Sequence, residues 1–304
     1  MISKNSLQYL RNPLKLIVRI GRDSFLRPLN DEAYLKLLYR ANMGEPLNLE
    51  RPVGFNEKLQ WLKINNRDSK YSLMADKHSV KQYVTSLIGS KYVIKELGVW
   101  DDFSDINFSE LPDRFVLKCT HNSGFIAVCR DKRNFDKKSA EKLLSHGMKL
   151  NYYWWGREWA YKNIKPRILA EEYVESHDFK ELRDYKFFCF DGEPKVMFIA
   201  TNRFNKEGEL KFDFFDMDFN CLEIQQGHPT SEHPPEKPAQ FALMKELAQT
   251  LSSGIPHVRV DFYEADGRVY FGEFTFYHFG GLVPFVPERW DKIFGSWIKL
   301  PVET

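Results

Sequence analysis

The sequence contains few cysteines, and they are far apart. Cys119 and Cys129 form the nearest pair, ten residues apart, and Cys189 and Cys221 follow much later in the chain. Zinc sites and disulfide frameworks use closely spaced or paired cysteines. The spacing therefore argues against both and favours reduced thiols that fill the core or the strands.

A long hydrophobic run is also missing. The most apolar early segment, residues 14–20, is short and is interrupted by Lys15 and Arg19. No small-residue cleavage site of a secretory signal follows it, and a membrane-spanning helix needs about 20 apolar residues. The sequence therefore predicts a cytoplasmic protein without a signal peptide or a spanning helix.

Net charge, glycine and proline are low as well. The 304 residues carry a formal charge of +2, with 17 Gly, 15 Pro, 43% hydrophobic and 28% charged residues. This composition excludes collagen-like and low-complexity chains and gives no overall field that would indicate a nucleic-acid partner. The length suits about two domains with a substantial core.

Periodicity and turn residues predict a mixed order of helices and strands. Helices are expected at 31–42, 55–66, 73–89, 137–154 and 241–254. Strands are expected at 113–120, 125–131 and 166–174. Two hairpins are expected over 184–203 and 257–276, because Asp-Gly dipeptides at their centres suit tight turns. The later half is therefore dominated by sheet.

The strongest local signal is the second hairpin. Arg259 and Asp261 are two residues apart on its first strand, and Glu273 and Thr275 are two apart on its second. Side chains two apart share a face of a strand, so all four can converge. Facing carboxylates suit a hard cation such as Mg²⁺, and an adjacent arginine suits a phosphate. A cross-strand salt bridge on a solvated face remains the alternative.

Two weaker signals precede this hairpin. Lys118 ends an apolar strand, and the Ser-Gly turn at 123–124 offers backbone N–H groups that would cradle phosphates together with a cation. Glu171 and Glu172 end a later strand and are followed by Asp178, an arrangement that would serve adenine and a ribose. Each signal alone is more typical of an ordinary strand end.

Taken in order, these stretches resemble the TupA-like ATP-grasp family of teichuronopeptide and capsular polysaccharide biosynthesis. The resemblance runs from about residue 55 to 301 and includes ADKHSVKQYV, LPDRFVLKCTHNSG, DYKFFCFDGEPK, RVDFYEADGRVYFGEFTFYHFGG and GSWIKLP. It implies an α+β ATP-grasp fold in which two subdomains clasp ATP. The implied divisions are a helical N-terminal region (1–74), a small nucleotide subdomain (75–172) and a large sheet-rich subdomain (173–304).

The resemblance also implies that ATP and Mg²⁺ are the cofactors. It assigns Arg259 and Lys118 to catalysis, Arg259 at the reacting phosphate. It assigns nucleotide contacts to two phosphate lysines, a phosphate-covering loop, an adenine hinge, a ribose-binding acid and one further lysine. These residues are Lys77, Lys118, His121, Ser123, Gly124, Glu171, Glu172, Tyr173, Val174, Asp178 and Lys186.

For the metal, the resemblance implies Asp261 and Glu273 as carboxylate ligands. Thr275 stands where many superfamily members have asparagine and is expected to be the third ligand. The substrate is expected to contact the segment that follows. Its residues are His278, Gly280 and Gly281.

The implied reaction is amide formation. A substrate carboxylate attacks the γ-phosphate of ATP, and an amine then displaces phosphate from the acylphosphate. The partners would be a uronic-acid carboxylate of a surface-polysaccharide precursor, small or glycan-linked, and an amino acid or other amine, with no nucleic acid. The oligomeric state stays open.

Two functions of other classes remain open. Asp216-Met217-Asp218 is a D-x-D triplet such as metal-dependent glycosyltransferases use, although a turn with solvated acids fits its surroundings better. A non-catalytic sugar-binding protein is the third class. The full set of lysine, arginine and carboxylate residues argues against it, because a binding module has no need of them.

The N-terminus is basic. Residues 1–29 hold six Lys or Arg and one Asp, interleaved with apolar residues over 14–20. This pattern resembles an interfacial helix that would contact anionic lipid or a polyanionic glycan. The short apolar side without Trp favours instead an amphipathic helix packed on the catalytic body, with its cations in water.

Overall fold

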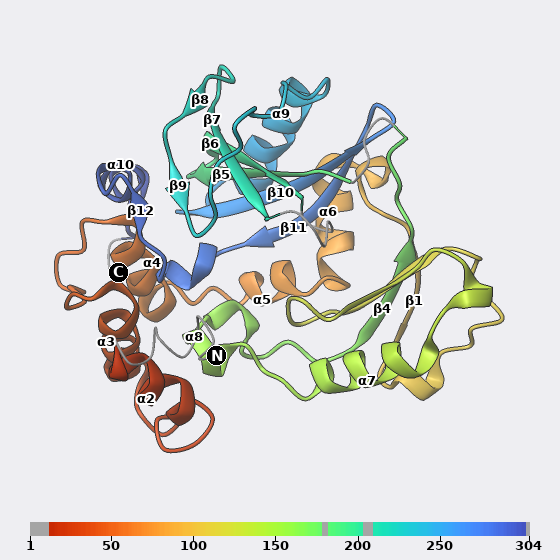
Figure 1. Cartoon of the computed structure of the whole chain (residues 1–304), viewed down its shortest axis with the longest axis horizontal. Helices are drawn as coiled ribbons and strands as arrows, with labels where there is room; N and C mark the ends of the chain where they lie inside the picture. Colours follow the sequence, from red (N-terminus) through yellow and green to blue (C-terminus); the bar gives the residue numbers. More distant parts are fainter. Residues whose placement is uncertain (1–11, 178–181, 203–208, 302–304) are drawn as a thin grey trace.

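The computed structural model describes residues 12–177, 182–202 and 209–301 of the chain. Helices and antiparallel sheets are mixed along it, which confirms the predicted α+β class. The larger sheet lies in the upper half of Figure 1 and the smaller one at its lower right. The helices are α2 (Pro13–Gly21), α3 (Asp31–Met43), α4 (Phe55–Asn65), α5 (Lys70–Ala75), α6 (Ser79–Ile88), α7 (Lys137–Met148), α8 (Tyr153–Gly156), α9 (Phe241–Ser252) and α10 (Arg289–Trp297).

The larger sheet has six strands in the order β11-β10-β5-β6-β7-β8. They are β5 (Asp184–Phe190), β6 (Glu193–Thr201), β7 (Lys211–Asp216), β8 (Cys221–Leu222), β10 (Val258–Ala265) and β11 (Arg268–Thr275). Successive side chains of buried β5 point to opposite faces. Phe187 packs on Phe241 of α9, whereas Phe188 packs on Phe55 of α4 and Phe294 of α10. Helices therefore cover both faces of this region.

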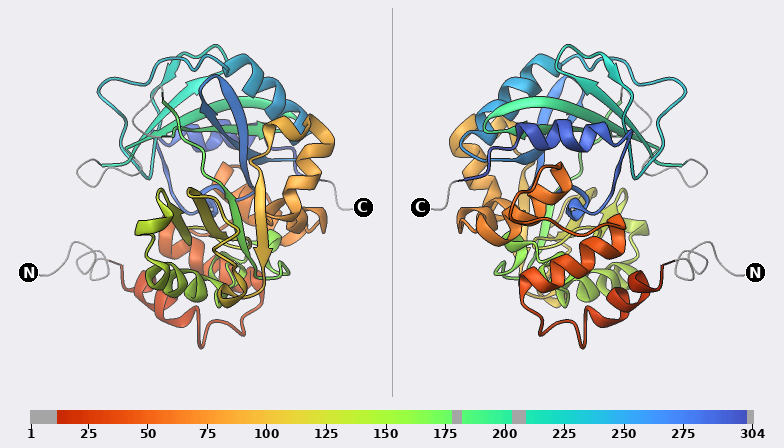
Figure 2. Two further views of the ribbon diagram at one scale, coloured as in Figure 1. Left: turned by 90° about the vertical axis from the view of Figure 1, so that its right-hand side faces the viewer. Right: turned by 90° about the vertical axis from the view of Figure 1, so that its left-hand side faces the viewer.

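The smaller sheet has four strands in the order β1-β4-β2-β3. They are β1 (Glu96–Trp100), β2 (Phe115–Cys119), β3 (Ile126–Cys129) and β4 (Ile168–Glu172). Phe115 and Leu117 of β2 form a core with Ala140 and Leu144 of α7, and this core uses one face of the sheet. By alternation Lys118 lies on the other face. Figure 2 shows this sheet and α7 below the larger sheet. Two further strands, β9 (Gln225–Gln226) and β12 (Phe285–Val286), form a separate short pair.

The N-terminal helices α2 and α3 are joined to the rest of the chain by a buried arginine. The guanidinium of Arg157 lies 4.4 Å from the ring centre of Tyr34 and 4.8 Å from that of Trp154, and it donates to the carbonyl of Arg27 at 3.1 Å. Stacking of a planar cation between aromatic rings is favourable when water is excluded. Across the described ranges, no helix has the length and apolar character needed to cross a membrane.

Two expected helices are shorter than predicted. The helix expected over 73–89 is broken between α5 and α6, because Asp76 leaves helical geometry and accepts a 2.6 Å hydrogen bond from Ser79 and a 2.9 Å bond from Arg167. The break places Lys77 outside both helices. The helix expected over 137–154 ends at Met148, and the short helix α8 follows separately.

Buried His257 predicts a pH-dependent stability. Burial lowers the pKa of His257 to about 3, although its Nδ1 is hydrogen-bonded to the Cys189 carbonyl at 2.9 Å. Below pH ~6.5 His257 is protonated in the unfolded chain but stays neutral in the folded chain. The free energy of unfolding therefore falls by up to ~1.4 kcal/mol per pH unit as the pH falls. We expect His257→Gln, which can still donate to that carbonyl, to reduce the slope of the free energy of unfolding against pH between pH 7 and 5, as measured by urea denaturation. Equal slopes for both proteins would contradict this.

Candidate active site

Two cross-strand rows of polar side chains lie on one face of the larger sheet. In the pairing register, Asp261 of β10 is opposite Lys186 of β5 on one side and Glu273 of β11 on the other. Arg259 is opposite Thr275 in the next row. Directly opposed residues of antiparallel strands share a face, so the four hairpin residues converge as the sequence predicts, together with Lys186.

Asp261 is held by two cations. Its carboxylate accepts bonds of 2.7 Å from both Nε and Nη2 of Arg259, and a 2.5 Å bond from Nζ of Lys186. The side chain is 1% exposed. Burial favours the protonated acid, but Arg259 and Lys186 outweigh it and hold the pKa of Asp261 below its usual value. This carboxylate is therefore ionised in the folded protein.

Glu273 and Thr275 are more accessible. The Glu273 carboxylate lies 3.7 Å from Arg259 and is 39% exposed, and the hydroxyl of Thr275 accepts from Arg259 at 3.0 Å. No cluster of three or more His, Cys, Asp or Glu side chains that would hold a metal occurs within the described residues. Two opposed carboxylates fit Mg²⁺ nevertheless, because this ion keeps several waters and is commonly bound by one or two carboxylates plus substrate phosphates.

The second set of cations comes from the smaller sheet and the α5–α6 break. Lys118 of β2 and Lys81 of α6 both pair with Glu171 of β4, Lys81 at 2.5 Å. Burial lowers the pKa of Lys77, and the charges of Glu273 and Glu171 oppose this shift. Lys77 is thus influenced by a carboxylate on each sheet, Glu171 on the smaller one and Glu273 on the larger one.

The loop after β2 has a fixed part and an exposed part. His121 and Asn122 are buried: His121 Nε2 contacts the Leu150 carbonyl at 3.0 Å, and the Asn122 carbonyl accepts from Lys77 at 2.5 Å. Ser123 and Gly124 are exposed, and Gly124 has a φ of 87° that suits glycine. Only the tip of this loop therefore presents itself to a ligand.

The predicted adenine hinge borders a cavity. Glu172, Tyr173 and Val174 line a cavity of about 680 Å³ between the end of β4 and the β10–β11 turn. The Arg114 guanidinium lies 4.6 Å from the centre of the Tyr173 ring. Glu171 points instead to the lysines described above. Asp178, the predicted ribose-binding acid, lies outside the described residues.

The turn after β11 contacts Arg259. Nδ1 of His278 lies 2.5 Å from Nη1 of Arg259, and burial with the nearby Arg259 charge keeps the pKa of His278 well below its usual value. Gly280 and Gly281 have φ values of 63° and 64°, and a Cβ on Gly281 would lie 2.5 Å from the amide nitrogen of Gln60. Space and conformation both favour glycine there.

Sequence reasoning missed three residues near this site. Lys81 shares Glu171 with Lys118, and its place in ADKHSVKQYV, four residues after Lys77, was the available signal. Glu158 and Tyr161 come from an irregular segment without periodicity. Neither residue carried a spacing signal.

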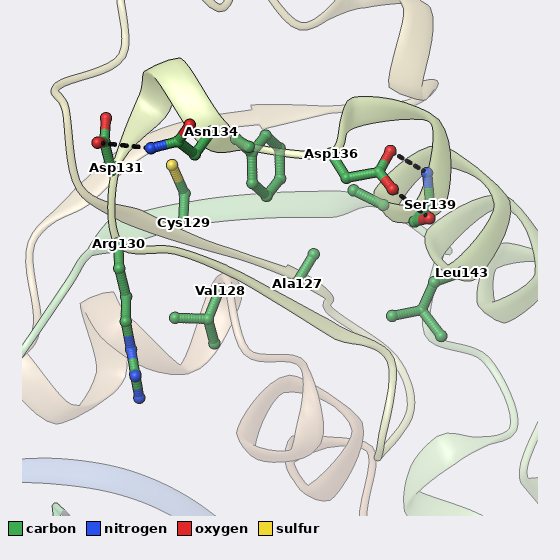
Figure 3. A pocket seen from close by; sticks show the side chains of 11 residues that line it. Ala127, Val128, Cys129, Arg130, Asp131, Asn134, Asp136, Ser139 and Leu143 are labelled. Atoms are coloured by element: carbon green, nitrogen blue, oxygen red, sulfur yellow. Dashed lines mark hydrogen bonds between the residues drawn. The ribbon is translucent and has the colours of Figure 1, made fainter.

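A separate groove of about 450 Å³ lies between β3 and α7 (Figure 3). Its acids are already used within the groove: Asp131 accepts from Asn134 at 3.0 Å, and Asp136 accepts from Ser139 at 2.7 Å. It contains none of the predicted site residues.

Comparison with known proteins gives one family match. The family described as TupA-like ATPgrasp matches residues 57–299. Among curated proteins, none matches the chain.

Several solved structures are distantly similar to the chain. D-alanine–D-alanine ligase from Bacillus anthracis is 16% identical, with a TM-score of 0.39, over 67% of this chain and 57% of that one. The Helicobacter pylori D-alanine–D-alanine ligase is 14% identical, with a TM-score of 0.42, over 81% and 69%. The ATP-grasp ligase PsnB, complexed with minimal precursor, Mg and ADP, is 10% identical, with a TM-score of 0.40, over 73% and 57%. The chain thus spans little more than half the length of two of these proteins.

Proposed function

The chain belongs to the TupA-like ATP-grasp family, and from this premise we propose that it is an ATP-dependent ligase that joins a carboxylate to an amine. One observation carries the proposal. The charges of Glu273 on the larger sheet and of Glu171 on the smaller sheet both act on Lys77, and Glu171 also pairs with Lys118. Charges of this kind suit a polyphosphate held between the two sheets.

The residues divide the work of phosphoryl transfer. Lys77, Lys118 and Lys186 would neutralise phosphate oxygens while the substrate carboxylate attacks the terminal phosphorus and ADP leaves. Asp261 and Glu273 would hold Mg²⁺, which supplies positive charge to those oxygens when bound. Arg259 would then stabilise the oxyanion that forms as the amine attacks the acylphosphate.

The exposed tip of the loop at Ser123 and Gly124 would close over the phosphates. An acylphosphate hydrolyses readily, so water must be kept from it. His121 and Asn122 anchor the base of the loop, and the hydroxyl of Tyr152 donates to the Ser123 carbonyl at 2.7 Å. Movement would therefore be restricted to a few residues, as is usual for lids.

The finer substrate assignment is a uronic-acid carboxylate of a surface-polysaccharide precursor and an amino acid or similar amine, and the family resemblance supports it. We place the reaction in the cytoplasm, with peripheral membrane contact through the basic N-terminus. The test is mass spectrometry of products after incubation with ATP, Mg²⁺, candidate uronates and a panel of amino acids. An amide with one equivalent of ADP is expected. UDP release from a nucleotide sugar would instead indicate the glycosyltransferase alternative.

The lysine assignment predicts a loss of nucleotide binding. Lys77→Met and Lys118→Met keep most of the apolar stem and remove the charge. We expect each to raise the ATP dissociation constant at least tenfold, which lowers ATP-induced stabilisation by about 1.4 kcal/mol at saturating ligand. Thermal melting with and without ATP measures this. Lys292→Met, an exposed lysine on α10, serves as the control and should melt like the parent. Undiminished ATP stabilisation in both site variants would remove the phosphate contacts from the proposal.

A further inference from the structure

Glu158 lies beside the turn that contacts the reaction-site arginine. A Cβ on Gly280 would be 3.3 Å from Oε1 of Glu158, and the carbonyl of Gly280 accepts a 2.7 Å bond from Lys63. Two residues earlier in the same turn, His278 touches Arg259. The turn therefore links the carboxylate of Glu158 to the place where the proposed acylphosphate would form.

The carboxylate of Glu158 can accept hydrogen bonds that the described residues do not supply. Within the described ranges, no hydrogen-bond donor reaches it and no cation lies within ion-pair distance. The charge of Lys63 acts on Glu158, but the Lys63 ammonium is already bonded to the Gly280 carbonyl and, at 3.0 Å, to Gln60. Burial raises the pKa of Glu158, as expected for a desolvated acid. The Glu158 side chain is half-buried, so an ammonium bound at its carboxylate would replace water there and would supply a charge-assisted hydrogen bond.

Tyr161 lies one short turn after Glu158, and its backbone N–H donates to the Glu158 carbonyl at 3.1 Å. Burial raises the pKa of Tyr161, the charges of Glu158 and Glu273 add to the shift, and Arg259 opposes it. Its ring centre is 6.2 Å from that of Tyr152, which donates to the phosphate loop. An aromatic ring beside a free carboxylate is a favourable environment for a cation.

We propose that Glu158 binds the ammonium group of the amine substrate, with Tyr161 and the Gly280–Gly281 turn as the walls of this subsite. The inference rests on the proposed ligase function. The charges of these side chains favour different substrates at the two places. Arg259 and Lys186 attract the acid and its phosphate, whereas Glu158 repels an acid and attracts a cation. An amine bound at Glu158 lies next to the turn that carries His278; its ammonium loses one proton to water, and the freed lone pair attacks the acylphosphate as phosphate leaves.

The test separates the two half-reactions. Carboxylate-dependent ADP formation, with hydroxylamine as a neutral trap for the acylphosphate, reports the first step and does not require the ammonium subsite. Amide formation against amine concentration reports the second step. We expect Glu158→Gln to leave the first rate within twofold of the parent and to raise KM for the amine about thirtyfold, because one charge-assisted hydrogen bond is lost.

Two further variants control for structure. Glu158→Asp keeps the charge but shortens the reach, and it should give an intermediate amine KM. Asp31→Asn removes another partly buried carboxylate, which accepts bonds from Tyr153 and Arg67, and it should lower the melting temperature without changing the amine KM. An unchanged amine KM in either Glu158 variant would overturn the inference. Absence of carboxylate-dependent ADP formation in the parent would instead overturn the ligase proposal itself.

Discussion

Glu273→Gln is expected to lower turnover a hundredfold to a thousandfold and to leave the melting temperature unchanged. The side chain is 39% exposed and makes only a 3.7 Å contact with Arg259, so its charge contributes little to folding. In the reaction the same charge would hold Mg²⁺ against the phosphates, where loss of one electrostatic group costs two to three orders of magnitude. Steady-state ADP release and thermal melting measure the two effects.

Asp261→Asn should behave differently, and the pair of variants tests the geometry. Asp261 is buried and balances both Arg259 and Lys186, so removing its charge leaves two buried cations without their main partner. We expect loss of turnover together with a loss of stability on the order of 3 kcal/mol in urea denaturation. Glu193→Gln, an exposed acid on β6, is the control. Near-normal turnover in both Glu273→Gln and Asp261→Asn would show that these carboxylates do not hold the metal.

The difference between these two acids illustrates what the sequence alone determines. Period-two spacing and the Asp-Gly turn were sufficient to predict that Arg259, Asp261, Glu273 and Thr275 share a face, because both are local properties of a hairpin. Burial depends on what packs above that face. Lys186 comes from β5, 75 residues away, and only the sheet order shows that it neutralises Asp261.

The irregular segments were the least predictable part of the site. Glu158 and Tyr161 lie in a stretch without helical or strand periodicity, and only the fold shows that Glu158 is close to a turn more than 100 residues later. The break at Lys77 was missed for a related reason. Residues 73–89 have helical periodicity, but a tertiary contact between Asp76 and Arg167 ends the first helix.

The sequence also does not determine what the apolar side of helix α2 contacts. Its periodicity predicts an apolar side but not what that side meets. In the structure Val18 and Gly21 are buried, whereas Ile17 and Ile20 are 47% and 61% exposed. The helix lies at the periphery of the molecule, at the lower left of Figure 1. The expectation that its apolar side packs on the catalytic body therefore describes only part of it.

The exposed apolar side chains of α2 and the following turn predict binding to anionic membranes. Leu16 and Phe25 are 40% and 61% exposed, and together with Ile17 and Ile20 they form the apolar part of this surface. Residues 12–29 also carry four cations and one acid. Apolar insertion with basic flanks is the arrangement of an interfacial helix, and the cations match anionic headgroups. A glycan would use the cations but would leave the apolar side chains in water, so the bilayer fits better.

We expect the full chain to sediment with vesicles of phosphatidylcholine and phosphatidylglycerol (3:1) at low salt and to bind phosphatidylcholine vesicles weakly. The triple variant Ile17→Ser, Ile20→Ser, Phe25→Ser should bind vesicles at least tenfold more weakly. It removes the apolar area that would enter the bilayer and leaves the charge unchanged. Val53→Ser, Leu73→Ser, Leu87→Ser is a matched control, since these side chains are 60%, 43% and 43% exposed elsewhere on the surface. High salt should weaken binding of the parent by screening. Equal binding by the two triple variants, or no binding by the parent at low salt, would contradict membrane binding through this helix.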